Sequence, residues 1–208
     1  MANTSITMRE NPLFTRNSFQ KSGYYEIPLV KKQKIDLTYL KFITFADTKY
    51  KDIKNKDCGV VFFIDDWRFY KIFDNPERTL PKLSQYPVLC TPEYSLNADL
   101  PVWRQIEHVA KNRWVGAYWQ SKGLKVIPSV NWGLSQTFDF CFDGVEKGSI
   151  VAVGMIGCKS DKTSFMKGYN EMLIHIEPEV ILCYGTPFNE MGGNIVKIDY
   201  WHKRNGGK

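Results

Sequence analysis

The chain has 208 residues, of which 43% are hydrophobic and 14% aromatic, and its formal net charge is +6. This length suffices for one domain with a sizeable core, and this composition excludes a chain that is disordered throughout. No window approaches the roughly 20 apolar residues of a membrane span, and residues 1–20 contain no apolar signal region.

The positive charge is concentrated at the two ends of the chain. Residues 1–57 hold 11 Lys and Arg against 6 Asp and Glu, and residues 197–208 hold 4 against 1. The intervening residues 58–196 are slightly acidic, with 13 against 15. Basic flanks of this kind either bind nucleic-acid phosphates through counterion release or remain solvated and keep the protein soluble. Both interpretations stay open.

The cysteines predict a reduced environment. There are five of them, an odd number, and no two form a CxxC pair. Free cysteines in strand-like runs behave as small hydrophobic residues. We therefore expect a cytoplasmic protein that makes no contact with membranes.

In chain order, residues 1–36 are interpreted as an extended arm that packs on the core through Phe14, Tyr24 and Tyr25. Apolar runs then predict strands at residues 41–46, 60–64, 87–91, 124–130, 138–142, 149–154, 180–183 and 195–200. Asn75 and Pro76 predict the start of a short helix that Pro81 curtails.

Two longer helices are predicted between these strands. Apolar residues recur at helical spacing from Val102 to Tyr118, and Gly123 suits a left-handed cap after the helix. A second amphipathic helix is expected over residues 164–176, before Pro178.

Strands that alternate with helices favour a single α/β domain built on a mainly parallel sheet. The chain is short for a full (β/α)₈ barrel, which needs about 250 residues. We expect a small irregular barrel or, as the alternative, an open mainly parallel sheet. The domain is assigned to residues 37–196, between the arm at 1–36 and a basic tail at 197–208.

Polar residues follow several predicted strands directly, and ligands of parallel α/β proteins bind beyond the carboxyl ends of the strands. The catalytic candidates are carboxylates: Glu93, Asp65, Asp66 and Asp143. The substrate-binding candidates are Asn131, Trp132, Tyr94, Ser95, Tyr184 and Arg113. Such a set suits acid–base chemistry, and its oxygen atoms also suit Mg²⁺ or Mn²⁺.

Structural roles compete with each of these assignments. Asp65 and Asp66 point to opposite faces of a strand, so only one enters a pocket, and Asp65 is favoured. Glu93 could instead pair with Arg113, and Asp143 fits an Asp-Gly turn.

Five segments in order resemble one family of bacteria and bacteriophages: VVFFIDDWRFY, CTPEYSLNADLPVWRQI, RWVGAYWQSKGLKVIPSVNWG, FCFDGVEKGSIVAVGMIGC and GYNEMLIHIEPEVILCYG. The family is the domain of unknown function numbered 4417, and the resemblance covers residues 40–186. It implies a phage, prophage or mobile-element origin and a cytoplasmic setting, and it implies no activity or catalytic residue.

Two functions have support in these patterns, whereas a third, a protein-binding inhibitor of a host factor, has no specific feature of the sequence in its favour. One is an enzyme with a carboxylate-lined pocket, a hydrolase or transferase that acts on a nucleotide, a nucleic acid or a glycosidic bond. The alternative is a non-catalytic protein that binds nucleic acid through its basic flanks.

Overall fold

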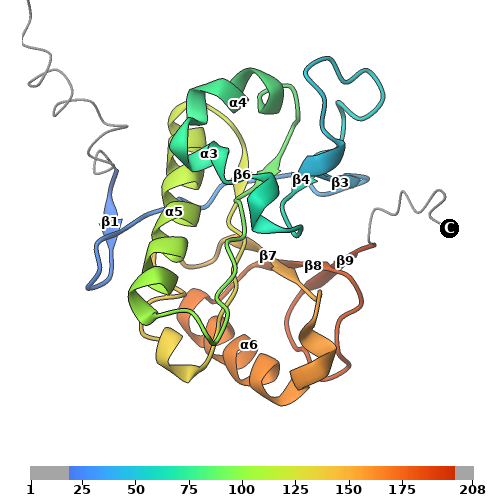
Figure 1. Ribbon diagram of the computed structural model, residues 1–208. Coiled ribbons are helices and arrows are strands. Elements are labelled where there is room, and N and C mark those ends of the chain that lie inside the picture. Colours follow the sequence, from blue (N-terminus) through green and yellow to red (C-terminus); the bar gives the residue numbers. More distant parts are fainter. Residues whose placement is uncertain (1–18, 200–208) are drawn as a thin grey trace, which may run out of the picture.

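The computed structural model describes residues 19–199. Parallel strands form its centre, with helices on either side (Figure 1). The strands are β3 (Phe42–Thr44), β4 (Gly59–Val61), β5 (Leu89–Cys90), β6 (Val126–Ile127), β7 (Ile150–Gly154), β8 (Val180–Tyr184) and β9 (Ile195–Ile198). The helices are α3 (Lys71–Asp74), α4 (Pro76–Leu83), α5 (Val102–Ser121) and α6 (Lys162–Ile176).

The sheet runs in sequence order. Strands β3 to β6 pair in parallel, as do β7 to β9. A parallel bridge between Ser129 and Ala152 joins the two sets, through hydrogen bonds from Val130 N to Ala152 O (2.8 Å) and from Ala152 N to Pro128 O (2.9 Å). Within residues 19–199 no pairing connects β3 to β9. The sheet is therefore open, and the expected parallel arrangement of its central strands is confirmed.

Alternating side chains of each strand serve two different cores, because successive residues of a strand point to opposite faces. Val60 and Phe62 face the helices α3 to α5, whereas Val61 and Phe63 face the concave side. On that side they pack with residues from all of the other parallel strands, from Phe42 of β3 to Ile198 of β9. The sheet thus curls around a filled interior.

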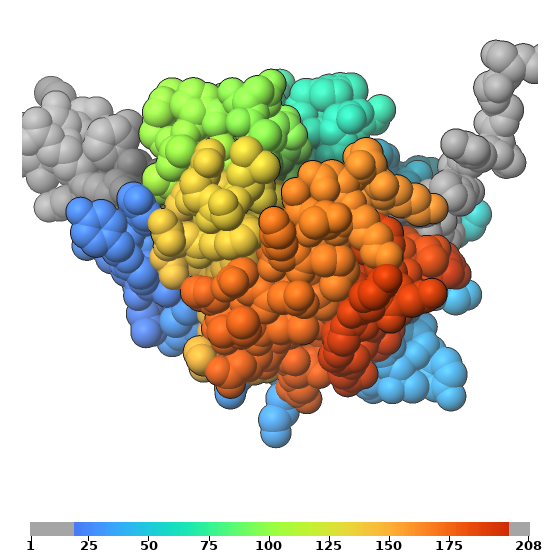
Figure 2. Space-filling model, turned by 90° about the horizontal axis from the view of Figure 1, so that it is seen from below, coloured from blue at the N-terminus to red at the C-terminus, as the bar shows by residue number. Residues whose placement is uncertain are grey.

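The outer faces of the two halves are covered separately. Trp114 and Trp119 of α5 are almost completely buried against the half from β3 to β6. Helix α6 covers the other half through Phe165, Tyr169 and Met172. In a view from below, α6 and the chain that follows it, orange to red, form the central and lower right part of the visible surface (Figure 2).

Most predicted elements are present, with three corrections. Residues 138–142 form turns and not a strand. Helix α4 continues past Pro81 to Leu83, with Asn75 as its N-cap, accepting a hydrogen bond from Arg78 N at 3.3 Å. In the arm, Tyr24 is 90% exposed and does not pack on the core, whereas Ile27 of β2 (Ile27–Pro28) is fully buried.

Strand β2 pairs with β1 (Lys21–Ser22) in an antiparallel hairpin. Phe14 and the end of the 195–200 strand prediction lie outside the described residues.

Candidate functional site

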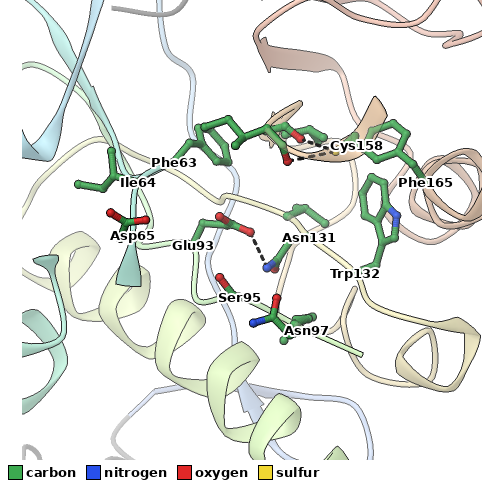
Figure 3. Close-up of a pocket in the computed structure, with 15 residues that line it drawn as sticks. Phe63, Ile64, Asp65, Glu93, Ser95, Asn97, Asn131, Trp132, Cys158 and Phe165 are labelled. Atoms are coloured by element: carbon green, nitrogen blue, oxygen red, sulfur yellow. Dashed lines mark hydrogen bonds between the residues drawn. The ribbon is translucent and has the colours of Figure 1, made fainter. Parts of the chain in front are cut away.

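A cavity of about 410 Å³ opens beyond the carboxyl ends of β4, β5, β6 and β7 (Figure 3). Its polar lining comes from five predicted or neighbouring positions: Asp65, Glu93, Ser95, Asn97 and Asn131. Its remaining lining is mainly apolar and comprises Phe63, Ile64, Leu96, Val130, Trp132, Val153, Gly154, Ile156, Cys158 and Phe165. The strand-end rule therefore predicts the position of the cavity correctly.

Glu93 and Asn131 are brought together by the parallel pairing of β5 with β6. Leu89 is opposite Val126 and Cys90 opposite Ile127, so the segments that leave the two strands run side by side. The amide Nδ2 of Asn131 donates to Glu93 Oε1 at 2.7 Å and to the Tyr94 carbonyl at 2.8 Å. Figure 3 shows the Glu93 carboxyl directed toward this amide.

The environment of Glu93 favours its protonated form. Burial and, to a smaller extent, the negative charge of Asp66 raise the pKa of Glu93 to about 8, against the opposing effect of the hydrogen bond from Asn131. A carboxyl whose pKa lies near neutral pH can donate or accept a proton under physiological conditions. Glu93 hydrogen-bonds Asn131 and lines the cavity, and Arg113 makes its hydrogen bonds to other groups.

The two adjacent aspartates separate as expected. Asp65 is exposed, lines the cavity and lies 3.6 Å from Arg68 Nε. Asp66 turns the other way and accepts hydrogen bonds from the backbone N and the Oγ of Ser95, both at 3.0 Å. Asp66 therefore ties the end of β4 to the segment after β5, and its charge still acts on Glu93.

Aromatic rings form the wall on the opposite side of Glu93 from Asp65 (Figure 3). Trp132 packs against Phe165 of α6, with ring centroids 5.0 Å apart. Gly168, one turn further along α6, is required for this contact, because a Cβ at this position would overlap the Trp132 ring. Phe63 supports the floor and stacks on Tyr184 at 5.3 Å between centroids.

Asp143 and Arg113 lie outside the cavity lining. Arg113 is 1% exposed and donates to the carbonyls of Ser129 (2.7 Å), Cys141 (3.0 Å) and Asp143 (3.1 Å), and to Asn112 Oδ1 (2.6 Å). Burial lowers the pKa of Arg113 to about 10, while Cys141 and Asp143 counteract this. The guanidinium thus holds the turns at 138–144 against the segment that follows β6. Arg113 and Asp143 are therefore not part of the candidate site described below.

Tyr94 and Tyr184 also contribute from behind the lining. The Tyr94 ring is 1% exposed and lies against Phe69, with centroids 5.3 Å apart, while its carbonyl receives the Asn131 amide. Tyr184 is buried in the interior of the curved sheet beneath Phe63. Both residues position the site and do not line the cavity.

Sequence reasoning missed Cys158 and Phe165. The Cys158 thiol donates to the Gly154 carbonyl at 3.4 Å, at the end of β7. Burial, with a smaller contribution from the charge of Glu93, raises the pKa of Cys158 to about 11. The signal was available, because Cys158 follows a predicted strand as Glu93 does. The contribution of Phe165 depends on how α6 packs, which no local pattern indicates.

The described residues contain no helix long and apolar enough to cross a membrane. Within residues 19–199, no group of three or more His, Cys, Asp or Glu side chains is placed to hold a metal ion. Mg²⁺ or Mn²⁺ therefore stays a prediction, for which Glu93 and Asp65 are the carboxylates that line the cavity.

Comparisons with known proteins identify the relatives of the chain. The Gene 1 protein of Mycobacterium phage L5 is 37% identical over 174 residues, which cover 82% of this chain and 75% of the relative. The Gene 1 protein of Mycobacterium phage D29 is 35% identical over 199 residues, covering 91% of this chain and 72% of the relative. No solved structure matches the chain. The family model described as "Domain of unknown function (DUF4417)" matches residues 19–201, a longer stretch than the sequence motifs indicated, and the chain belongs to this family.

Proposed function

We propose that the cavity is the active site of a hydrolase or transferase that acts on a nucleotide or glycosidic bond, with Glu93 as its general acid. One observation carries this proposal: a carboxyl with a pKa of about 8 lines a cavity of about 410 Å³ at the carboxyl ends of parallel strands. A volume of this size holds a small ring-bearing ligand.

Glu93 holds a proton at neutral pH and donates it to the oxygen or nitrogen of the leaving group, while water or an acceptor hydroxyl attacks the centre from which that group departs. The Asn131 amide, fixed by its second hydrogen bond to the Tyr94 carbonyl, orients the carboxyl for this transfer. Asp65 at the rim supplies a second carboxylate in a more solvated setting. Two carboxylates in different environments are the usual arrangement for separate acid and base roles.

Trp132 and Phe165 supply a flat apolar wall opposite Asp65. Aromatic side chains beside carboxylates suit sugar rings and nucleobases, which present an apolar face and polar edges. The polar groups Ser95 and Asn97 lie on the lining between these two sides and can contact ligand hydroxyl or amide groups. This arrangement favours a nucleoside-like or sugar-like ligand over an extended aliphatic one.

The test is a panel of nucleosides, nucleotides and aryl glycosides, each with and without Mg²⁺ or Mn²⁺, scored by thermal shift and by product formation. We expect one class to raise the thermal midpoint and to be converted, and Glu93→Gln to abolish conversion while the protein remains folded. Asp143→Asn is the matched control, since it removes a carboxyl outside the lining, and it should retain activity. Unchanged turnover in Glu93→Gln would refute the proposed role of Glu93.

The pH dependence provides a second test. A general acid must be protonated, so kcat should be constant below a pH of about 8 and should fall tenfold per unit above it. A rate that instead rises through this pH would assign Glu93 as a base and contradict its role as the acid.

A further inference from the structure

The opposite edge of the sheet carries a concentration of exposed lysines. Because β3 to β6 are parallel, the residues that precede them gather at one edge, away from the cavity. Lys41 precedes β3, and Lys54 and Lys56 precede β4. We call the following eight residues the lysine edge: Lys31, Lys32, Lys34, Lys41, Lys54, Lys56, Lys122 and Lys125, all of which are exposed.

Two glutamines hold residues 31–34 against the start of β6. Gln120 of α5 accepts from Lys31 N (2.9 Å) and donates to Lys31 O (2.7 Å). Gln33 accepts from Val126 N (2.8 Å) and donates to Leu124 O (3.3 Å). These contacts use the backbone of Lys31 and the side chain of Gln33, and they leave the lysine side chains of the segment exposed.

The lysine edge is poorly neutralised. None of its eight ammonium groups takes part in an ion pair among residues 19–199. Acidic residues are fewer in the same segments. Asp36, Asp52 and Asp57 lie among these lysines in sequence, and Glu146 accepts a hydrogen bond from Lys32 N. A positive field therefore remains along this edge.

An exposed aromatic residue stands within the lysine edge. Tyr39, between Lys34 and Lys41, is 97% exposed and has a left-handed backbone with φ of 61°. Leu37 and Leu40 on either side anchor the turn by packing on the interior of the sheet. A non-glycine residue in this conformation is uncommon, and here it holds the ring out in solvent at the apex of a fixed turn.

We infer that the lysine edge binds single-stranded nucleic acid, with the lysines on consecutive phosphates and a base stacked on Tyr39. Single-strand binding surfaces combine a positive track with aromatic rings on which unpaired bases stack. Duplex bases are already stacked and offer no face to Tyr39, so the exposed ring favours a single strand. This surface is separate from the cavity, and the inference does not depend on the proposed activity.

The experiment uses the full chain and a fluorescein-labelled oligothymidylate, with binding followed by anisotropy over a range of salt concentrations. The wild type should bind at low salt, and its affinity should fall linearly in a double-logarithmic plot against salt because phosphate contacts release counterions. The charge reversals Lys31→Glu/Lys34→Glu and Lys122→Glu/Lys125→Glu should each lower the affinity at least about tenfold and flatten the salt slope. Lys159→Glu/Lys167→Glu, which changes two exposed lysines that are not in the lysine edge, should leave both unchanged.

Tyr39→Ala separates a single-strand site from a general attraction to phosphate. It should weaken oligothymidylate binding about 5- to 100-fold, as expected for one lost stacking contact, and leave any weak binding to duplex unchanged. Tyr24→Ala is the matched control, since Tyr24 is 90% exposed on the β1–β2 hairpin. Circular dichroism verifies that each variant is folded.

Three outcomes would overturn the inference. The first is oligothymidylate affinity that is unchanged in both charge reversals but lost on removal of residues 1–18 or 200–208, which would assign binding to the ends of the chain. The second is equal or tighter binding to duplex, with Tyr39→Ala without effect. The third is binding to phosphatidylserine vesicles and not to oligothymidylate.

Discussion

The two ends of the parallel strands, called here the carboxyl edge and the amino edge of the sheet, differ in how far their charged side chains are removed from water. At the carboxyl edge, Glu93 is partly buried, fixed by Asn131 and shifted in pKa to about 8. At the amino edge, the lysine side chains are exposed and form no ion pair among residues 19–199, whereas hydrogen bonds of Gln120 and Gln33 fix the chain at Lys31 and Gln33. A desolvated charge is tuned for proton transfer, whereas solvated charges act together at long range. The difference indicates that the two edges serve separate tasks.

The largest expected effect is on kcat, which should depend on the carboxyl edge and not on the lysine edge. Glu93→Gln keeps the shape of the side chain and removes its proton, so kcat should fall about 10²–10⁴-fold. Lys122→Glu/Lys125→Glu should leave kcat unchanged on a small substrate. Steady-state kinetics of both variants measures this, and a comparable loss in the lysine variant would show that the edges are coupled.

The second effect is on stability and depends on pH. Native Glu93, with a pKa of about 8 against an ordinary value of 4.5, keeps a proton that the unfolded chain releases. Its contribution is fully present below a pH of about 4.5 and is lost as the pH rises to about 8. As the pH rises through this range, the free energy of unfolding of the wild type should therefore decrease relative to that of Glu93→Gln, by a few kcal/mol at most.

Urea unfolding of both proteins at several pH values between about 4.5 and 9 measures the difference, in which the other titrating groups cancel. A constant difference would mean that Glu93 titrates alike in the folded and unfolded chains.

A smaller effect is expected at the aromatic wall. Gly168→Ala forces the Trp132 ring away from α6, which should cost about 1–3 kcal/mol of stability and weaken ligand binding. Gly192→Ala is the control, since a Cβ there meets no atom within 4 Å. Thermal unfolding and ligand titration compare the two, and equal behaviour would remove the argument that Trp132 is held in place by this contact.

The smallest effect concerns Asp66. Asp66→Asn removes the charge that adds to the Glu93 shift, so the pKa of Glu93 should decrease while burial keeps it above its ordinary value. The pH above which kcat falls should therefore move to a lower value. No movement would assign the whole shift to burial.

Local patterns predicted the elements well where a buried strand or a two-faced helix is the simplest way to cover apolar side chains. The 138–142 prediction was wrong because Phe140 and Phe142 are buried within turns. Arg113 of α5, which is distant in sequence, holds these turns through hydrogen bonds to the Cys141 and Asp143 carbonyls. Asp143 was chosen as a strand-end residue on that premise, and it lies outside the cavity lining accordingly.

Some residues of the cavity could be predicted from the strand pattern, whereas their pKa values and exposure depend on the folded structure. The sequence analysis predicted that the central strands are parallel. It therefore also predicted that the residues directly after them lie close together: Glu93, Asn131, Ser95, Trp132 and Asp65. The Glu93 pKa could not, because it depends on burial by residues of several strands and on the charge of Asp66. Nor could Tyr39 be recognised, because its exposure and left-handed backbone are visible only in the folded turn.

The central claim is that Glu93 is largely protonated at neutral pH within the cavity. The most direct measurement is the titration of its side-chain carboxyl carbon by nuclear magnetic resonance, with Glu93→Gln used to assign the signal. A midpoint near 8 is predicted. A midpoint near the ordinary value of 4.5 would contradict this mechanism, since Glu93 would then have no proton to donate at neutral pH.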